Sequence, residues 1–311
     1  MRREDQPTRA SHSMPSVRHI EVSQAEAGHK LLQFLERRLG KAVPRALMMK
    51  WLRTGQVRVD GRRAKPFDRL EAGQTVRVPP HEPGEPGEGP ESRPAPPRPL
   101  PVVHEDEELL VIAKPAGLAS QPGSGITDSV QTRLKALYAG RDFVPSAAHR
   151  LDMDTSGLMV AGKTYRSLRR LGDLFATGGV DKTYLAWVKG EWPESGTVLL
   201  QDRIVRDGHA RVRIGEHGGQ GEGKLAAARV RPIVRRPDAS LLEVELLTGR
   251  MHQIRIQLAS RGHPVLGDRK YGRRPHATHL LLHAWKLKLP EREFRLPPDW
   301  PDEYMPPGDL R

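Results

Sequence analysis

Two stretches near the start of the chain carry apolar residues at the spacing of an amphipathic helix. The first stops at Gly40, while the second opens at Pro44 and stops near Gly55, and proline and glycine are typical of helix starts and ends. The pattern therefore predicts two short helices, with apolar faces formed by Leu31, Leu32, Phe34 and Leu35 and by Leu47, Met48, Trp51 and Leu52.

Alternating apolar and basic residues follow these helices. Segments 57–59 and 76–78 both read Val-Arg-Val, which predicts half-buried strands, and Asp60-Gly61 predicts the turn after the first one. Residues 18–80 are thus expected to form a small α/β module. Its basic side chains are expected to face water: Arg45, Lys50, Arg53, Arg58, Arg62, Arg63 and Lys65.

Residues 101–311 mix helix and strand patterns. A helix is predicted over 127–139, with an apolar face of Val130, Leu134 and Leu137, and a second apolar helical face is formed by Leu168, Leu171, Leu174 and Phe175. Apolar or alternating runs predict strands at 109–113, 158–161, 182–188, 204–214, 225–234 and 241–247. The last four have no helix between them, so we expect an α+β domain with a mixed, largely antiparallel sheet. No Gly-rich loop precedes a helix, which argues against a nucleotide-binding fold.

Proline, glycine and polar residues mark the boundaries of these parts. Residues 1–17 are predicted to be a disordered tail, and residues 81–100, which are rich in proline and glycine, a hydrated linker. The run 215–223 predicts an exposed loop. The expected organisation is therefore a tail, a module over 18–80, a linker, and a large domain over 101–311.

Composition and charge restrict the classes of protein. The 311 residues include no cysteine, so neither a disulfide framework nor a thiolate metal site is expected. No window approaches the roughly 18 apolar residues of a membrane helix, and the charged start leads into no apolar run. We expect a soluble, cytoplasmic protein with no membrane partner. The net charge is +13, and residues 1–80 hold 17 Lys and Arg against 8 Asp and Glu. This excess predicts a nucleic-acid partner, with a merely solvated basic surface as the alternative.

Candidate chemistry lies around Asp152. This acid follows Arg150-Leu151 and precedes a turn-forming Asp-Thr-Ser-Gly, so it is expected on a loop anchored by the strand at 158–161. A lone carboxylate can be a nucleophile, a base, or a stabiliser of positive charge at a sugar carbon. Arg150 and Arg255 are candidates to keep it ionised, and Tyr184, on a predicted strand, is a candidate to lie over a planar substrate.

These segments resemble a known family in their order and spacing. Residues 149–157 read His-Arg-Leu-Asp-Met-Asp-Thr-Ser-Gly, 182–190 read Lys-Thr-Tyr-Leu-Ala-Trp-Val-Lys-Gly, and 249–255 read Gly-Arg-Met-His-Gln-Ile-Arg. Together with 262–272, they resemble the signatures of the pseudouridine synthases of the ribosomal-large-subunit group. Residues 18–80 resemble the RNA-binding module of ribosomal protein S-four, through the turn Gly-x-Val-x-Val-Asp-Gly at 55–61.

The resemblance implies a reaction and roles for residues. The reaction is isomerisation of uridine to pseudouridine in large-subunit ribosomal RNA, by base flipping and without a metal or nucleotide cofactor, and we expect a monomer. Asp152 would act at the anomeric carbon, Tyr184 would pack on the base and help to remove the carbon-five proton, and Arg255 would pair with the aspartate. Arg150 would fill the gap left by the flipped uridine. The remaining expected substrate-binding residues are His149, Arg250 and His252, and both histidines are also interpreted as structural hydrogen-bonders.

Several departures and alternatives stay open. Met251 stands where the family has Thr, and Leu289-Pro290-Glu291 replaces its Phe-x-His-Pro segment. A catalytically silent RNA-binding protein, a synthase acting on transfer RNA, and a glycoside hydrolase with a second acid across a cleft are the rival functions. Asp154 is interpreted as a turn residue. No acid or cysteine completes a zinc site with His276, His279 and His283, so no metal is expected.

Overall fold

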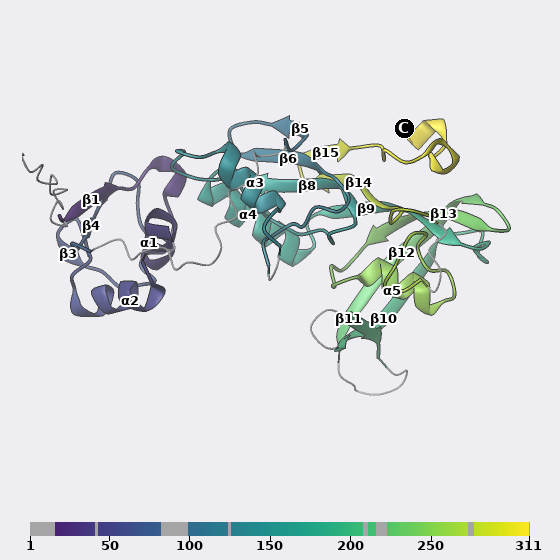
Figure 1. Ribbon diagram of the computed structural model, residues 1–311, viewed down its shortest axis with the longest axis horizontal. Helices are drawn as coiled ribbons and strands as arrows, with labels where there is room; N and C mark the ends of the chain where they lie inside the picture. Colours follow the sequence, from purple (N-terminus) through teal and green to yellow (C-terminus); the bar gives the residue numbers. More distant parts are fainter. Residues whose placement is uncertain are drawn as a thin grey trace, which may run out of the picture. The chain divides into compact units, whose positions relative to one another are not determined.

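The chain forms two compact units, residues 1–95 and 96–311, each described here by itself. The computed structural model describes residues 16–40, 43–81, 99–123, 126–207, 211–215, 223–272 and 277–310 (Figure 1). The predicted tail 1–17, linker 81–100 and loop 215–223 lie almost wholly outside the described residues, as does His276.

The first unit contains a four-stranded sheet and two helices. Helix α1 ends at Gly40, and α2 starts after Pro44 and ends at Gly55, whose backbone is left-handed (φ 71°) as the glycine permits. Both predicted helices are confirmed, as is the turn at Asp60-Gly61, where both residues have positive φ. The sheet order is β1-β4-β2-β3. The elements are β1 (Arg18–Glu21), η1 (Gln24–Glu26), α1 (Leu31–Leu39), α2 (Arg45–Thr54), β2 (Arg58–Val59), β3 (Arg62–Arg63) and β4 (Thr75–Val78).

The apolar faces of these elements meet in one core. Every apolar residue assigned to the helices is buried except Leu47, which packs at the edge of this core. The seven basic residues listed for this module are all exposed, as predicted. The polar surface is therefore strongly basic, while the core is small and local.

The second unit is built on an 11-stranded sheet, which confirms the predicted α+β class. Its main path is β11-β10-β12-β13-β9-β14-β8-β6-β5, with β15 beside β14 and β7 beside β8. Among the described strands the pairing is antiparallel except between β14 and β8. The strands are β5 (Val102–Glu105), β6 (Leu109–Lys114), β7 (Ser146–Ala147), β8 (Ser156–Gly162), β9 (Asp181–Lys189), β10 (Val198–Asp207), β11 (Arg211–Ile214), β12 (Lys224–Arg235), β13 (Ala239–Leu246), β14 (Leu282–Leu289) and β15 (Arg292–Arg295).

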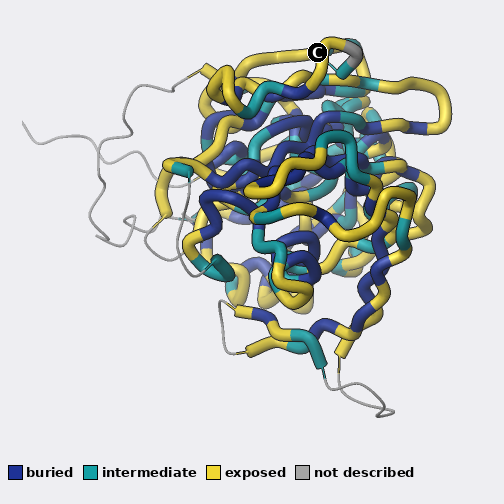
Figure 2. Tube along the Cα trace, turned by 90° about the vertical axis from the view of Figure 1, so that its right-hand side faces the viewer, coloured by how far each residue is buried: buried dark blue, intermediate teal, exposed yellow. Residues whose placement is uncertain are grey.

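Helices cover both faces of this sheet. The largest core joins one face of the strands to apolar residues of α3 (Val130–Leu137) and α5 (Gln253–Ser260). Helix α4 (Tyr165–Thr177) packs on the opposite face, and the short helices η3 (Asp302–Tyr304) and η4 (Gly308–Leu310) contribute to a third cluster. Figure 2 shows that buried stretches of the chain alternate with exposed loops. The face that carries α3 and α5 is the one on which the candidate site lies.

Two expectations for this unit are wrong. Residues 204–214 were expected as one strand, but they contribute to a hairpin of β10 and β11. The sequence of this span includes Asp207-Gly208, and Asp-Gly is a strong hairpin-turn signal that the alternating pattern concealed. Leu137, expected on the buried face of α3, is 48% exposed because it is the last residue of that helix and lies beyond the sheet-facing residues Val130 and Leu134.

Candidate active site

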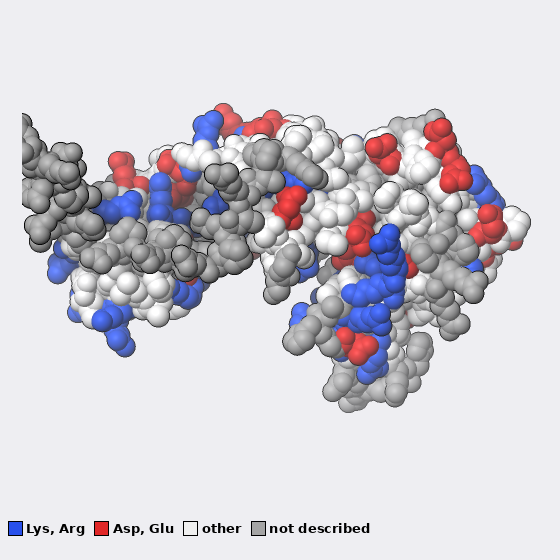
Figure 3. Space-filling view, viewed as in Figure 1, with Lys and Arg blue, Asp and Glu red and all other residues white. Residues whose placement is uncertain are grey.

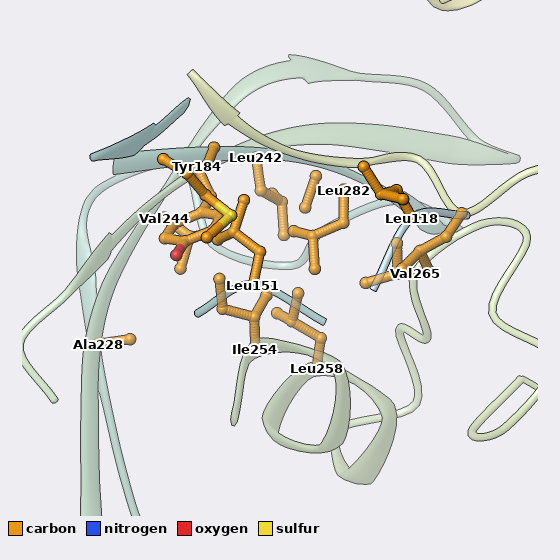
Figure 4. Packing of buried hydrophobic residues seen from close by; sticks show 14 of the residues in the cluster. Leu118, Leu151, Tyr184, Ala228, Leu242, Val244, Ile254, Leu258, Val265 and Leu282 are labelled. Carbon is orange, nitrogen blue, oxygen red and sulfur yellow. The ribbon is translucent and has the colours of Figure 1, made fainter. Parts of the chain in front are cut away.

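Asp152 lies on the loop that connects β7 to β8. The backbone N–H of Thr155 donates to the carbonyl of Asp152 (3.2 Å), which closes a turn through Asp154. Leu151 is buried in the largest core, and Figure 4 shows it between Ile254 of α5 and the strands of the sheet. The loop is therefore anchored, while the Asp152 side chain keeps 21% of its surface exposed.

Arg255 brings a positive charge to this carboxylate from α5. Its Nη1 donates to Oδ2 of Asp152 at 3.3 Å. Its Nε and Nη2 donate to the two carboxylate oxygens of Asp268 at 2.7 and 2.8 Å, a bidentate pair that fixes the plane of the guanidinium. Burial lowers the pKa of Arg255, but the bonds to Asp268 and the charge of Asp152 outweigh it, so the net pKa is raised and the group stays charged.

Asp268 is a fully buried support for that arginine. Besides Arg255, it accepts hydrogen bonds on Oδ1 from the backbone N–H groups of Lys270 (2.8 Å) and Tyr271 (3.1 Å). Burial raises the pKa of Asp268, yet these bonds and the charge of Arg255 hold it below its ordinary value. Both oxygens of this carboxylate are thus occupied, so Asp268 is not a second acid of the kind that a glycoside hydrolase needs.

Tyr184 comes from β9, opposite Val244 of β13 in the sheet register. It is 8% exposed and belongs to the same core as Leu151 and Ile254 (Figure 4). Burial and then the charge of Asp152 raise the pKa of Tyr184 far above its ordinary value. The side chain is therefore a neutral phenol.

His252 and Tyr271 complete the surroundings of Asp152. His252 precedes α5 with a left-handed backbone (φ 51°), and its Nε2 is 3.9 Å from Oδ2 of Asp152. Its Nδ1 shares a hydrogen bond of 2.8 Å with the Tyr271 hydroxyl, and the Tyr271 ring lies 5.4 Å from the Arg255 guanidinium carbon. Burial lowers the pKa of His252, against the charge of Asp152. Both contacts to Asp152 use Oδ2, and in the described part of the chain Oδ1 is left open.

Comparison with known proteins identifies the family of this site. Residues 108–260 match the family model of RNA pseudouridylate synthases. The chain is 35% identical over 291 residues to the ribosomal large subunit pseudouridine synthase C of Escherichia coli (strain K12), which covers 88% of this chain and 89% of that protein. The chain belongs to the RNA pseudouridine synthase family. The protein of the same name from Vibrio vulnificus is 33% identical over 275 residues, covering 86% of this chain and 84% of that protein.

Solved structures agree on the fold of this pseudouridine synthase. Human RNA pseudouridylate synthase domain containing 4 superposes with a TM-score of 0.55 at 24% identity, covering 66% of this chain and 90% of that structure. The domain-containing 1 protein gives a TM-score of 0.54, also at 24% identity, with coverage of 70% and 89%. The expectation of an RNA pseudouridine synthase with an α+β catalytic domain is confirmed.

Two other residues predicted for the synthase site, Arg150 and Arg250, are exposed to solvent. Arg150 is exposed on the loop, and the contacts of the Asp152 carboxylate go to Arg255 and His252 instead. Arg250 is also exposed, and its Nε donates to the carbonyl of Leu225 (2.9 Å).

His149 belongs to the support of the loop. Its Nε2 accepts from the backbone N–H of Val160 (3.1 Å), and its ring stacks on Phe175 of α4 at 4.5 Å. Burial lowers the pKa of His149 to about 3, so the ring stays neutral. These contacts agree with its interpretation as a structural hydrogen-bonder, and they place it on the face opposite α5.

Sequence reasoning missed the groups that hold the synthase site in place. Asp268 and Tyr271 stand in the matched segment 262–272, and Lys114 follows the strand at 109–113, yet none of them was given a role. Asp268 and Tyr271 had a signal, namely their place inside a matched segment, whereas Lys114 was marked only by its position after a predicted strand. Ser120, which bonds to Leu151, had no signal of this kind.

Neither a metal site nor a membrane span is found among the described residues. No group of three or more His, Asp or Glu side chains there is arranged to hold a metal ion. His283 shares one hydrogen bond with the Ser156 hydroxyl and another with the carbonyl of Leu296, both 2.8 Å, so its ring is used structurally. Within the same residues, no helix has the length and apolar content to cross a membrane.

Proposed function

We propose that this enzyme converts uridine to pseudouridine in large-subunit ribosomal RNA, with the Asp152 carboxylate acting at the anomeric carbon of a flipped nucleotide. The curated relatives above carry that substrate in their names, and they span nearly the whole chain. The single observation that supports the role of Asp152 is its geometry: Oδ2 is held by Arg255 at 3.3 Å, while Oδ1 has no hydrogen bond to any described residue.

The proposed chemistry balances as an isomerisation. The bond from N1 of uracil to C1′ of ribose breaks, the base turns, and a bond from C5 to C1′ forms, while one proton leaves C5 and one is gained at N1. Positive charge develops at C1′ when the first bond weakens, and an open carboxylate oxygen stabilises it or bonds to it. No electrons are gained or lost overall, so we propose a reaction that needs no metal or nucleotide cofactor.

Tyr184 is proposed to support the base and to assist proton removal from C5. Because burial and the Asp152 charge raise its pKa, the side chain meets the substrate as a phenol. A phenol accepts a proton only while it passes its own proton on, so we assign it a place in a relay and not the role of a preformed phenolate.

Arg150 is proposed to enter the stack of bases after flipping. Its side chain is exposed on the loop that carries Asp152, so it is free to reach the RNA. Flipping costs a few kcal/mol of stacking, which a guanidinium in the gap offsets in part. His252 and Arg250 are proposed to line the site, and Asp152, Tyr184 and Arg255 to carry the chemistry.

Residues 18–80 are proposed as an RNA-binding module, joined by the linker 81–100 to the catalytic domain 101–311. Exposed cations lie on α2, β2 and β3: Arg45, Lys50, Arg53, Arg58, Arg62 and Arg63. In the second unit, Figure 3 shows Lys and Arg side chains gathered where α5, β10 and β11 lie. The exposed basic residues of β10 and β11 are Arg203, Arg206, Arg211 and Arg213, and Arg250 is exposed three positions before α5. These surfaces fit a phosphate backbone, and we propose that the protein acts as a monomer in the cytoplasm.

Pseudouridine mapping in ribosomal RNA tests the proposal. Cells that lack the protein should lose pseudouridine at defined large-subunit positions, and the wild-type protein should restore it. Asp152→Asn should restore none, because an amide of the same shape carries no charge, while Asp173→Asn on α4 should restore it fully. Loss confined to transfer RNA would contradict the substrate, and full modification by Asp152→Asn would contradict the role of Asp152.

The proposed module has its own test. Lys50→Ala with Arg62→Ala removes two exposed charges of the first unit without touching Asp152. RNA should bind more weakly with unchanged kcat. The slope of the logarithm of the binding constant against the logarithm of the salt concentration should become less steep by about 0.7 to 0.9 for each lost phosphate contact. Unchanged RNA affinity at every salt concentration would contradict the module.

A further inference from the structure

A buried lysine lies beneath the loop that carries Asp152. Lys114 is the last residue of β6 and is 1% exposed. Its Nζ donates to three backbone carbonyls: Pro115 at 2.9 Å, Leu118 at 2.7 Å and Met153 at 2.8 Å. An ammonium group has three donors, and these three acceptors use all of them. The lysine therefore ties the turn after β6 to the residue that directly follows Asp152.

A buried serine from the same turn holds the residue before Asp152. Ser120 is 5% exposed, and its hydroxyl donates to the carbonyl of Leu151 (2.7 Å) and accepts from the N–H of the same residue (3.0 Å). Both backbone polar groups of Leu151 thus depend on one side chain. The turn 114–120 contacts the catalytic loop on both sides of Asp152, through residues more than 30 positions away in the sequence.

We propose that Lys114 and Ser120 are positioning residues, which fix the backbone on either side of Asp152 so that its open Oδ1 is aimed at the anomeric carbon. The proposal rests on the proposed function of Asp152. A reacting atom that is misplaced by about 1 Å costs on the order of 100-fold in rate. Arg255 holds only Oδ2, so the direction of Oδ1 depends on the loop backbone.

The charge of Lys114 supplies a readout that a purely structural role lacks. Burial lowers the pKa of Lys114 to about 7, while the charges of Asp154 and Asp152 on the facing loop raise it. Its other neighbours are the three carbonyls and Gly157, its register partner in β8. When the ammonium loses a proton, one of the three donors is lost, and the brace at Met153 weakens as pH rises through that range.

The test uses the full chain, a large-subunit ribosomal RNA fragment, and kcat and KM measured across a pH series. Lys114→Met keeps the volume of the side chain without its donors, and Ser120→Ala removes the hydroxyl. Lys163→Met is the matched control: Lys163 also donates to a backbone carbonyl (Asp106, 2.6 Å), but it follows the opposite end of β8. Folding of each variant is checked by thermal unfolding before rates are compared.

We expect Lys114→Met to lower kcat by about 10- to 100-fold and Ser120→Ala by about 10-fold, each with KM changed by less than about twofold. Lys163→Met should keep the wild-type kcat. The kcat of the wild type should fall toward that of Lys114→Met as pH rises above about 7. The wild-type kcat divided by the Lys114→Met kcat should therefore decrease with pH. If Lys114→Met does not fold, Ser120→Ala and the wild-type pH profile decide the question.

Three outcomes would overturn the proposal: a folded Lys114→Met with wild-type kcat, an equal loss in Lys163→Met, or a ratio that does not change with pH. If instead the wild-type protein forms no pseudouridine in the RNA, the proposed function fails and not the positioning role. The two failures are thus distinguished in one series of measurements.

Discussion

Replacing Asp268 by asparagine removes the anchor of Arg255 and keeps its shape. In the native protein the pair is bidentate at 2.7 and 2.8 Å, with the side chains 6% and 0% exposed. Removing one partner of a buried ion pair costs about 3 to 5 kcal/mol, because the other charge is left without compensation. Asp152 still lies 3.3 Å from the guanidinium, so we expect a loss at the lower end, about 3 kcal/mol.

The loss of activity should exceed what unfolding explains. The asparagine keeps one acceptor oxygen but presents an N–H₂ donor to the other guanidinium nitrogen, so the bidentate grip is lost and Arg255 is free to turn toward the open Oδ1 of Asp152 and cover it. We expect kcat of the folded protein to fall by about 10- to 100-fold, with little change in KM for RNA. Urea denaturation followed by tryptophan fluorescence reports the stability, because Trp187, Trp192 and Trp285 all lie buried in the second unit.

Asp202→Asn provides the matched control. Asp202 is a buried acid of β10 that accepts hydrogen bonds from Gln257 (2.7 Å) and Arg261 (3.0 and 3.2 Å), so its loss also destabilises the α5 region. It has no bond to Asp152 or Arg255, and kcat should stay within about twofold of wild type. A folded Asp268→Asn with wild-type kcat would refute the reasoning, as would an equal loss of kcat in Asp202→Asn.

Three further predictions concern other parts of the catalytic unit. The kcat of the wild type divided by that of Tyr184→Phe should be constant between about pH 6 and 9, since the raised pKa of Tyr184 keeps the phenol protonated. A tenfold rise of this ratio for each pH unit would show instead that the phenolate is the reacting form. Gly157→Ala should lower the free energy of unfolding, measured in urea, by about 2 kcal/mol or more, because the φ of Gly157 is 116° and a Cβ there would lie 2.3 Å from a backbone oxygen of β14. The control is Gly172→Ala: Gly172 lies in open space on α4, so this change should raise the free energy of unfolding by about 0.5 to 1 kcal/mol. Burial lowers the pKa of His149 to about 3 and that of His283 to about 4 in the folded protein. As pH falls below about 6.5 these histidines therefore bind protons in the unfolded chain before they do so in the folded one, and Tm should fall. An equal Tm at about pH 5 and 7.5 would contradict this prediction.

The local elements of the first unit were predictable from the sequence because glycine and proline mark their ends. Gly40, Pro44 and Gly55 bound two helices whose apolar residues are separated by three and four positions. The basic residues of this unit were also correctly predicted to be exposed, since a small module has no second layer of structure to bury them. In this unit, the local pattern and the tertiary structure agree.

The order of strands in the second unit was not predictable in the same way. Strand β14 lies between β8 and β9, although more than 90 residues separate it from β9 in the chain. Strands β5, β7 and β15 are short, and their sequences show little alternation. Pairings of this kind are decided by tertiary packing, and the sequence pattern does not encode them.

The site was predictable in part. Asp152 and Arg255 were paired through the family resemblance, and the structure brings them to 3.3 Å across 103 positions of the chain. The roles of Asp268 and Lys114 follow from burial, because a carboxylate or an ammonium at 0–1% exposure has to be paired. Burial of a single charged residue leaves no periodic trace in the sequence, so their roles became visible only in three dimensions.

The two edges of the Arg255 guanidinium explain how one arginine can hold Asp152 and still leave it available for the role proposed for it. The edge formed by Nε and Nη2 donates to Asp268 at 2.7 and 2.8 Å, which are ordinary lengths for charge-assisted hydrogen bonds. Only Nη1 reaches Asp152, at 3.3 Å, which is long for such a bond. A carboxylate held this loosely keeps much of its charge for a cationic sugar carbon. A bidentate grip on Asp152 would neutralise it and block Oδ1. Under the proposed mechanism, Asp268 is therefore as necessary to the reactivity of Asp152 as Arg255 itself, because it occupies the edge of the arginine that would otherwise bind both oxygens of Asp152.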